Sequence, residues 1–336
     1  MPDSLFHAAY TDETVLVTGG AGAIGSNLTK KLLDYGARVV VIDDLSSGFQ
    51  ANLPVHPRLR FLKQDIVERP LVRHLFAAFR PAYVFHLAAH YANLRSIEEP
   101  ARDLTVNTLA LLTLLEAAHT WPVKRFLFAS SSCVYHHQAA LPLTEESPLA
   151  PTTPYAISKA TAEAYCLFYH QYYGLDSVIL RYFNSYGPGD RPGPYRGVVP
   201  NMLATALQGK PLIITGSGAE TRDFTFVDDI VRGTLLAGCI PEARGQIFNL
   251  ASGIETSITS LAQLITDLTG NTAEIDYRPR RNWDVVQRRG ASIKKAQQIL
   301  GYSVETGLKE GLALTYTWTL SQTAKEGTRY ENIIYQ

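Results

Sequence analysis

The sequence predicts an α/β fold, namely a Rossmann-type doubly wound parallel sheet with a smaller, interleaved α+β domain. Three observations support this prediction. Short apolar stretches alternate with helical patterns through about residue 183, a glycine-rich turn follows the first apolar stretch, and the composition changes beyond Asn184. Such alternation is typical of parallel sheets that are covered by helices on both faces.

The first predicted strand turns directly into a helix. The apolar run at residues 15–17 is followed by Gly19, Gly22 and Gly25 and then by a helical pattern over residues 26–35. This arrangement directs unpaired backbone amides and the positive end of the helix dipole towards one point, which suits a pyrophosphate. Glycine allows both the sharp turn and the close approach of a ligand.

The second predicted strand, at residues 38–42, ends in Asp43. A carboxylate at this point accepts hydrogen bonds from both hydroxyls of an adenosine ribose, whereas it repels a 2′-phosphate. The sequence therefore predicts NAD(H) as the cofactor rather than NADP(H).

The remaining elements of a dinucleotide-binding domain over residues 1–183 follow in order. Strands are predicted to begin near residue 59 and to cover 83–87, 125–129 and 177–182, and helices to cover 71–79, 103–119 and 154–173. Ligands of such sheets bind at the carboxyl ends of the strands, so we expect the chemistry just after each strand.

The second domain is predicted over residues 184–336. Residues 186–200 are rich in Gly and Pro, as in a boundary or a binding loop. Helices are predicted at 199–208 and 260–269, strands at 212–215 and 273–277, and a strand that returns to the main sheet at 246–251. The two domains are therefore expected to interleave.

Composition limits the possible partners and location. Lys+Arg and Asp+Glu are balanced at 31 each, so no nucleic-acid or membrane-surface partner is expected. No apolar run approaches the roughly 20 residues of a membrane helix, and the N-terminus does not resemble a signal peptide. Cys133, Cys166 and Cys239 fit neither a disulfide framework nor a metal site, so we expect no metal and a cytoplasmic location.

Three residue types that suit proton transfer are spaced for one site. Tyr155 and Lys159 share one face of the predicted helix at 154–173, because residues four apart are neighbours on a helix. Ser130, Ser131 and Ser132 end a strand upstream. A tyrosine has a pKa of about 10. A nearby ammonium and an oxidised nicotinamide lower that pKa, which makes the phenol a base near neutrality.

Seven segments resemble the extended short-chain dehydrogenase/reductases. They are TGGAGAIG, VIDDLSSG, HLAAH, SSSCVY, YAISK, RYFNSYGP and RDFTFVDD, between about Thr14 and Tyr302. Within this family they are most similar to the nucleotide-sugar epimerase/dehydratase group, which includes the UDP-glucose and UDP-glucuronate 4-epimerases.

The resemblance implies a role for each matching position. The residues implied to bind NAD are Gly19, Gly22, Ala23, Ile24, Gly25, Asp43, Asp65, Ile66, Leu87, Ala88, Ala89, Asn107, Tyr155, Lys159 and Tyr182. The implied catalytic residues are Ser131, Tyr155 as the base, and Lys159. The residues implied to contact a nucleotide-diphosphate sugar are Ser131, Ser132, Tyr155, Asn184, Arg191, Val198, Arg222, Arg281 and Asp284.

The implied reaction is inversion at C4 of a nucleotide-diphosphate sugar, with a UDP-sugar favoured, through a transient 4-keto sugar. Permanently bound NAD and a homodimer joined through a four-helix bundle also follow from the resemblance. Arg191 resembles the arginine that UDP-glucuronate 4-epimerases place near the sugar carboxylate, so the substrate is expected to be a UDP-hexose or UDP-glucuronic acid.

Ser132 and Cys133 separate this chain from related activities. The 4,6-dehydratases that it resembles carry an Asp-Glu pair there, so dehydration is disfavoured. The GDP-fucose synthase type has a similar cysteine, but Gly197 replaces its partner histidine. A nucleotide-sugar ketoreductase, a 3,5-epimerase/reductase and a catalytically silent nucleotide-binding module stay open as alternatives.

Overall fold

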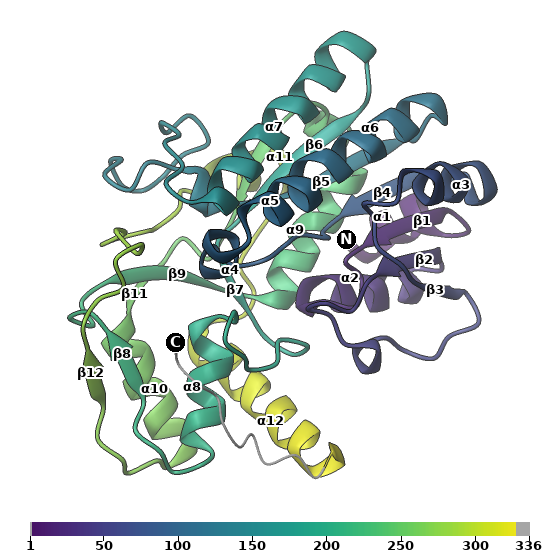
Figure 1. The fold of residues 1–336 in the computed structure, drawn as a ribbon. Coiled ribbons are helices and arrows are strands. Elements are labelled where there is room, and N and C mark those ends of the chain that lie inside the picture. The colour runs from purple at the N-terminus through teal and green to yellow at the C-terminus, as the bar shows by residue number, and fades with distance from the viewer. Residues whose placement is uncertain (1, 327–336) are drawn as a thin grey trace.

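Seven parallel strands form the central sheet of the molecule (Figure 1). The computed structural model describes residues 2–326. The strand order is β10-β6-β5-β4-β1-β2-β3, and each neighbouring pair is parallel. The strands are β1 (Thr14–Thr18), β2 (Arg38–Asp43), β3 (Leu59–Lys63), β4 (Tyr83–His86), β5 (Arg125–Ser131), β6 (Ser177–Tyr182) and β10 (Ile247–Leu250). The predicted doubly wound parallel sheet is therefore confirmed.

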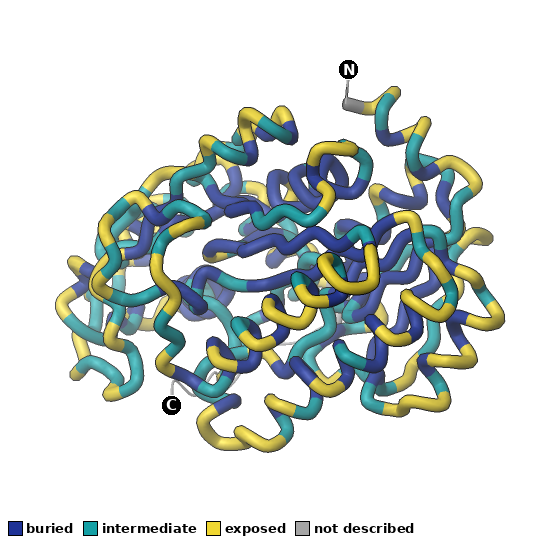
Figure 2. Tube along the Cα trace, turned by 90° about the horizontal axis from the view of Figure 1, so that it is seen from above, coloured by how far each residue is buried: buried dark blue, intermediate teal, exposed yellow. Residues whose placement is uncertain are grey.

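The central strands are mainly apolar because both faces of the sheet are covered. In β1, Val15 and Val17 belong to the core on one face, whereas Leu16 belongs to the core on the other. Side chains of a strand alternate between its two faces, so a sheet buried on both sides needs apolar residues at every position. Figure 2 shows the central strands as a buried layer between more exposed helices.

Helices cover each face of this sheet. One face carries α1 (Pro2–Tyr10), α2 (Ala23–Asp34), α9 (Val227–Cys239) and α11 (Lys294–Leu300). The other carries α3 (Arg69–Phe79), α6 (Ala110–Thr120) and α7 (Pro154–Tyr173), with α4 (Asn93–Glu98) and α5 (Pro100–Leu104) at the end of α7. Helix α9 was not predicted, and it covers the main sheet although it comes from beyond residue 184.

The single long helix predicted over residues 103–119 is interrupted. Residues Thr105–Leu109 form a π-helical turn between α5 and α6. Asn107 lies in this turn, and its amide donates to the carboxylate of Asp103 at 2.8 Å and to the hydroxyl of Ser158 at 3.1 Å. π-Helical turns inside helices are frequent near functional sites.

The smaller part of the molecule lies beyond the carboxyl ends of the strands (Figure 1). Its strands are β7 (Asn184–Tyr186), β9 (Thr221–Phe226) and β11 (Glu255–Ser257) in one sheet and β8 (Ile213–Thr215) and β12 (Asp276–Arg278) in another. Its helices α8 (Val198–Ala206), α10 (Ile258–Thr269) and α12 (Leu308–Glu326) pack on one another. Within residues 2–326, none of the helices combines the length and the apolar character that a membrane crossing requires.

Candidate active site

A cavity of about 540 Å³ lies between the carboxyl ends of the parallel strands and the smaller part of the chain. This volume is in the range of small-molecule sites. The predicted site residues that line it are Gly19, Gly22, Ala23, Ile24, Gly25, Asp43, Asp65, Ile66, Leu87, Ala88, Ala89, Ser131, Ser132, Tyr155, Lys159, Tyr182, Asn184, Val198, Arg222, Arg281 and Asp284. The structure therefore brings together residues from the whole length of the chain.

The glycine turn is built for close approach. Gly19 has a φ of +69°, and a Cβ there would lie 2.6 Å from the amide nitrogen of Ala88. A Cβ on Gly25 would lie 2.2 Å from the carbonyl oxygen of Gly19. Gly22 precedes α2 and offers no side-chain cap, so the first amides of this helix face the cavity without intrahelical partners. The turn thus forms an anion-binding end of the cavity.

Asp43 is held in a fixed orientation at the end of β2. Its carboxylate accepts hydrogen bonds from the amides of Ala21 and Leu45, both at 2.9 Å. Burial raises the pKa of Asp43, and the two backbone hydrogen bonds oppose that shift. Asp65, at the same end of the cavity, forms an ion pair with Arg102.

Tyr155 and Ser131 meet at the other end of the cavity. Thr153 caps α7 by accepting a hydrogen bond from the amide of Ala156 at 3.3 Å, and this sets the start of the helix that carries Tyr155. Ser131 ends β5, and its hydroxyl accepts from the amide of Cys133 at 3.2 Å. The neighbouring Ser130 also lines the cavity, but its hydroxyl donates to Glu163 at 2.5 Å.

Within the protein, Tyr155 is not made acidic by its neighbours. Burial raises its pKa well above the usual value, Cys133 and Tyr91 act in the same direction, and Ser131 lowers it. The ammonium of Lys159 donates to the carbonyl oxygen of Ala129 at 2.8 Å rather than to the phenol. Burial lowers the pKa of Lys159 to about 8. The protein groups alone leave the pKa of the phenol raised, and the lowering expected from the ammonium together with an oxidised nicotinamide stays a prediction.

Two predicted site residues do not line the cavity. Asn107 is buried behind its wall, where its side-chain oxygen accepts from the amide of His90 at 2.8 Å. His90 does line the cavity, so Asn107 contacts the cavity wall and not the cavity itself. Arg191 lies with its guanidinium 4.4 Å from the centroid of the Phe49 ring, outside the residues that line the cavity.

Two of the arginines that were predicted to contact the substrate lie in the smaller domain. Arg222 forms an ion pair with Asp284, and its Nη2 lies 3.2 Å from both carboxylate oxygens. The Arg281 guanidinium lies 5.7 Å from the centroid of the Trp283 ring. Both guanidinium groups line the cavity.

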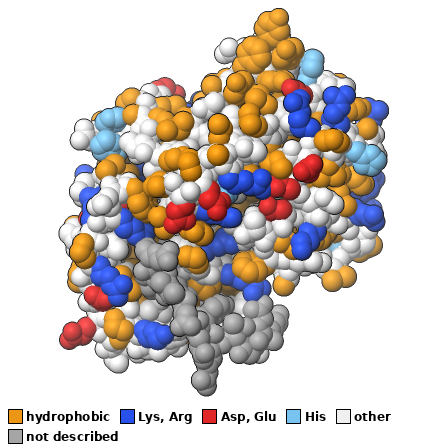
Figure 3. All heavy atoms as spheres, in the orientation of Figure 1, with side chains coloured by type: hydrophobic (Ala, Val, Ile, Leu, Met, Phe, Trp, Pro, Cys, Tyr) orange, Lys and Arg blue, Asp and Glu red, His pale blue; other side chains and the backbone are white. Residues whose placement is uncertain are grey.

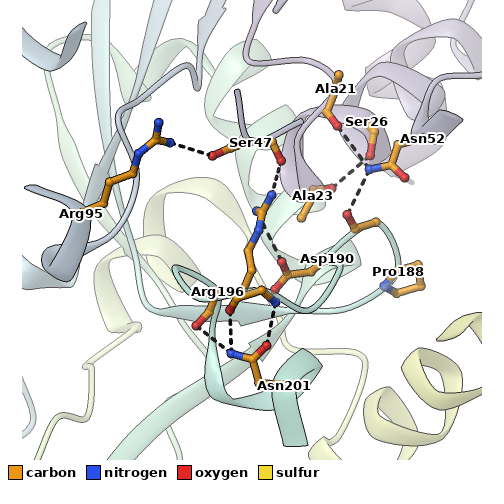
Figure 4. Close-up of polar contacts among 12 residues, drawn as sticks. Ala21, Ala23, Ser26, Ser47, Asn52, Arg95, Pro188, Asp190, Arg196 and Asn201 are labelled. Carbon is orange, nitrogen blue, oxygen red and sulfur yellow. Dashed lines mark hydrogen bonds and ion pairs between the residues drawn. The ribbon is translucent and has the colours of Figure 1, made fainter. Parts of the chain in front are cut away.

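A set of polar contacts joins the Gly/Pro-rich loop to the first strand–helix unit (Figure 4). Asn52 donates to the carbonyl oxygens of Ala21 at 3.2 Å and Gly189 at 3.0 Å. Arg196 donates to the carbonyl of Ser47 and forms an ion pair with Asp190 at 3.7 Å. These residues were not predicted, and the loop that they hold lies across the glycine-turn end of the cavity.

Cys133 lies between two further cavity residues that the sequence analysis missed. Its sulfur accepts from the side-chain amide Nδ2 of Asn93 at 3.8 Å and from Nη1 of Arg289 at 3.7 Å. Neither residue lies in a recognisable sequence motif. Arg289, for example, is simply the second of two consecutive arginines. Across residues 2–326, no three His, Cys, Asp or Glu side chains converge as metal ligands would.

The model of the NAD dependent epimerase/dehydratase family matches residues 15–251, which include the glycine turn, Ser131, Tyr155 and Lys159. The chain belongs to this family. Its cofactor class is therefore NAD, as Asp43 predicted.

Curated relatives and solved structures extend the likeness over nearly the whole chain. A UDP-glucose 4-epimerase of Mycolicibacterium smegmatis is 38% identical over 304 residues, which cover 89% of this chain and 96% of the relative. A UDP-glucuronate 4-epimerase of Thermodesulfobacterium geofontis is 32% identical over 90% of this chain and 95% of its own.

The fold is equally similar to solved epimerases. The epimerase Mth375 of Methanothermobacter thermautotrophicus is 43% identical with a TM-score of 0.94, covering 97% of this chain and 96% of its own. A UDP-glucose 4-epimerase of Thermotoga maritima, solved with UDP-glucose, is 36% identical and has a TM-score of 0.88. The match covers 92% of this chain and 99% of the Thermotoga chain. The chain thus shares both the fold and the order of sequence motifs of this enzyme family.

Proposed function

We propose that this protein is an NAD-dependent 4-epimerase of nucleotide-diphosphate sugars that acts on a UDP-hexose or UDP-glucuronic acid. The observation that carries the proposal is one cavity that joins the glycine turn to the Ser131, Tyr155 and Lys159 side chains. Such a cavity holds a dinucleotide at one end and a reacting hydroxyl at the other.

The residues present fit NAD at the first end. The amides at the start of α2 would hold the pyrophosphate where a Cβ on Gly19 or Gly25 would clash with backbone atoms. Asp43, oriented by two backbone amides, would accept the hydroxyls of the adenosine ribose. Asp65 and Ile66 would lie at the adenine, and Leu87, Ala88 and Ala89 along the cofactor.

Tyr155 would move the proton of the sugar 4-hydroxyl. When bound, oxidised NAD supplies a positive nicotinamide ring beside the phenol and takes up and returns the hydride of the sugar carbon. The positive charge opposes the burial that keeps the phenol protonated in the protein alone. Ser131 would hydrogen-bond the reacting oxygen, and Lys159 would add a second positive charge near the phenol.

The substrate's diphosphate would lie at the smaller domain. Arg222 and Arg281 supply two guanidinium groups there, and Asp284 holds Arg222 in place. Asn184 and Val198 line the same region from β7 and α8. Guanidinium groups bind phosphate oxygens bidentately, which anchors the nucleotide while the keto sugar turns over.

The wall around Tyr155 favours epimerisation over elimination. Ser132 and Cys133 supply no carboxylate where an elimination at C5 and C6 needs an acid and a base. Simple return of the hydride to the other face of C4 needs only the phenol and the cofactor, so a dehydratase is the weaker alternative.

The same proposal includes a homodimer. Helices α5 and α6, the turn between them and α7 pack side by side and leave large apolar side chains exposed. These side chains include Leu104, Leu109, Ile157, Phe168 and Tyr172. Figure 3 shows hydrophobic side chains gathered over the part of the face where α7 lies. An apolar surface on adjacent helices suits a four-helix bundle with a second copy.

The test is to incubate the protein with a panel of UDP-, dTDP- and GDP-sugars and to follow the sugar configuration by proton NMR. We expect inversion at C4 without added NAD and without release of NADH. Net NADH formation would instead identify a dehydrogenase, and a 4-keto-6-deoxy product would identify a dehydratase. If no sugar of the panel is changed, the result would favour the alternative of a catalytically silent nucleotide-binding module.

A further inference from the structure

Arg289 is the buried member of the arginines that line the cavity, and it differs from three of them in its partners. Its side chain is only 8% exposed and lines the cavity. Arg102, Arg196 and Arg222 each form an ion pair with an aspartate. Among residues 2–326, no carboxylate forms an ion pair with Arg289, and its hydrogen bond goes to the sulfur of Cys133 at 3.7 Å.

The contacts of Cys133 place this guanidinium at the catalytic end of the cavity. The amide of Cys133 donates to the hydroxyl of Ser131 at 3.2 Å, and Cys133 also contributes to the raised pKa of Tyr155. Arg289 is therefore one side chain away from the residues that would hold the reacting sugar carbon. Asp43 and Asp65 lie at the opposite, adenosine end.

The backbone beside Arg289 is fixed, so the point from which its side chain enters the cavity is set before a ligand arrives. The carbonyl of Gly290 accepts from the amide of Leu143 at 2.8 Å, and the amide of Ala291 donates to Asp223 at 3.4 Å. A Cβ on Gly290 would lie 2.5 Å from Cγ of Glu255, which shows how closely the segment is packed.

A buried guanidinium without a carboxylate partner is costly unless a bound anion completes it. A nucleotide-diphosphate sugar brings the diphosphate, for which Arg222 and Arg281 are available. Resting on the function proposed above, we propose that Arg289 binds a carboxylate on the sugar ring, so that the preferred substrate is a nucleotide-linked uronic acid. Arginine suits this role because its planar fork matches a carboxylate bidentately.

This assignment replaces the role first expected of Arg191. The Arg191 guanidinium lies on the Phe49 ring and not on the cavity wall, whereas Arg289 lines the wall beside Cys133. Under this proposal, the carboxylate contact first expected of Arg191 is made by Arg289.

The test compares kcat/KM for UDP-glucuronate and UDP-glucose in the wild type, Arg289→Met and Arg289→Lys. We expect the wild type to prefer UDP-glucuronate. Arg289→Met should lower kcat/KM for UDP-glucuronate by about 10- to 100-fold, as for loss of a charge-assisted hydrogen bond, and change UDP-glucose by less than about 3-fold. Arg289→Lys should recover part of the loss because it restores the charge.

Arg288→Met is the matched control, because Arg288 is the exposed neighbour whose guanidinium pairs with Glu255 at 2.7 Å. It should leave the ratio of the two substrates unchanged. An equal loss for both sugars in Arg289→Met would assign Arg289 to the diphosphate and overturn the proposal. A wild-type preference for UDP-glucose would also overturn the proposal for Arg289, but it would not contradict the proposed 4-epimerase activity. Absence of C4 inversion in both sugars would count against the epimerase itself.

Discussion

The Lys159 ammonium lies 5.8 Å from the centroid of the Tyr155 ring, and it donates its hydrogen bond to the carbonyl of Ala129 at 2.8 Å. In the proposed mechanism the lysine would therefore act on the phenol through its charge and not by direct donation to the phenolic oxygen. Two consequences follow, one for the tyrosine itself and one for the pH at which the lysine keeps its charge.

Tyr155→Phe should lower kcat by about 10²- to 10⁴-fold, the usual contribution of a general base. Bound NAD should be retained, because the residues that would hold the dinucleotide are untouched. Tyr165→Phe is the control, since Tyr165 lies on the same helix but does not line the cavity. Turnover is followed by proton NMR and bound NAD by absorbance after denaturation. Full activity in Tyr155→Phe would remove the phenol from the mechanism.

The activity should fall above pH about 8. Burial lowers the pKa of Lys159 to about 8, so the ammonium is present below that pH and is lost above it. The phenol of Tyr155 needs this charge, because burial raises its own pKa. Lys159→Arg keeps a positive charge at every accessible pH and should move the alkaline fall upwards. An identical fall in the variant and the wild type, measured as kcat/KM, would assign it to another group.

Much of the site could be predicted because its residues follow strand ends. Gly19, Asp43 and Ser131 stand at fixed offsets from apolar runs, and the carboxyl ends of parallel strands meet at one edge of a sheet. The parallel order of the strands and the helix that carries Tyr155 and Lys159 follow from the same local patterns.

What could not be predicted depends on contacts between distant segments. Cys133 meets Arg289 across 156 residues, Asn52 meets Gly189 across 137, and Arg222 meets Asp284 across 62. No local pattern signals such pairs, because each is created by the way the smaller domain folds over the sheet. The turn around Asn107 was missed because apolar periodicity does not distinguish a π-helical turn from a regular helix.

Asp190→Asn should stabilise the protein at neutral pH. Burial raises the pKa of Asp190 from 3.8 to about 6, although Arg196 opposes the shift. A folded-state pKa above the unfolded one means that the stabilising contribution is complete below pH about 4 and is lost as the pH rises through about 6. The gain in unfolding free energy should therefore grow between pH 5 and 7.5, to at most about 3 kcal/mol. Urea unfolding across this range measures it, and a gain that shrinks with rising pH would contradict the argument.

Asn52→Ala should loosen the hold on NAD. The side chain bridges the carbonyls of Ala21 and Gly189, so its removal detaches the Gly/Pro-rich loop from the glycine turn (Figure 4). Loss of two hydrogen bonds of about 1 kcal/mol each corresponds to roughly 10- to 30-fold weaker retention of the cofactor.

The measurement for Asn52→Ala is the NAD content after gel filtration, with activity before and after addition of NAD. Gln50→Ala, an exposed neighbour in the same short helix (Gln50–Asn52), is the control. Retention equal to that of the control would show that the loop does not secure the cofactor.

Leu109→Lys should separate the proposed dimer into monomers. Leu109 is 51% exposed in the turn between α5 and α6, and Ile157 on the adjacent α7 is 50% exposed. A charge at the centre of an apolar interface loses its hydration on association, which costs several kcal/mol when it is unpaired. Val55→Lys is the control, because Val55 is fully exposed outside these helices. Light scattering after gel filtration gives the mass. A dimer that persists in Leu109→Lys and Ile157→Lys would mean that the subunits associate through a different surface, whereas monomers with intact turnover would show that each cavity is complete within one chain.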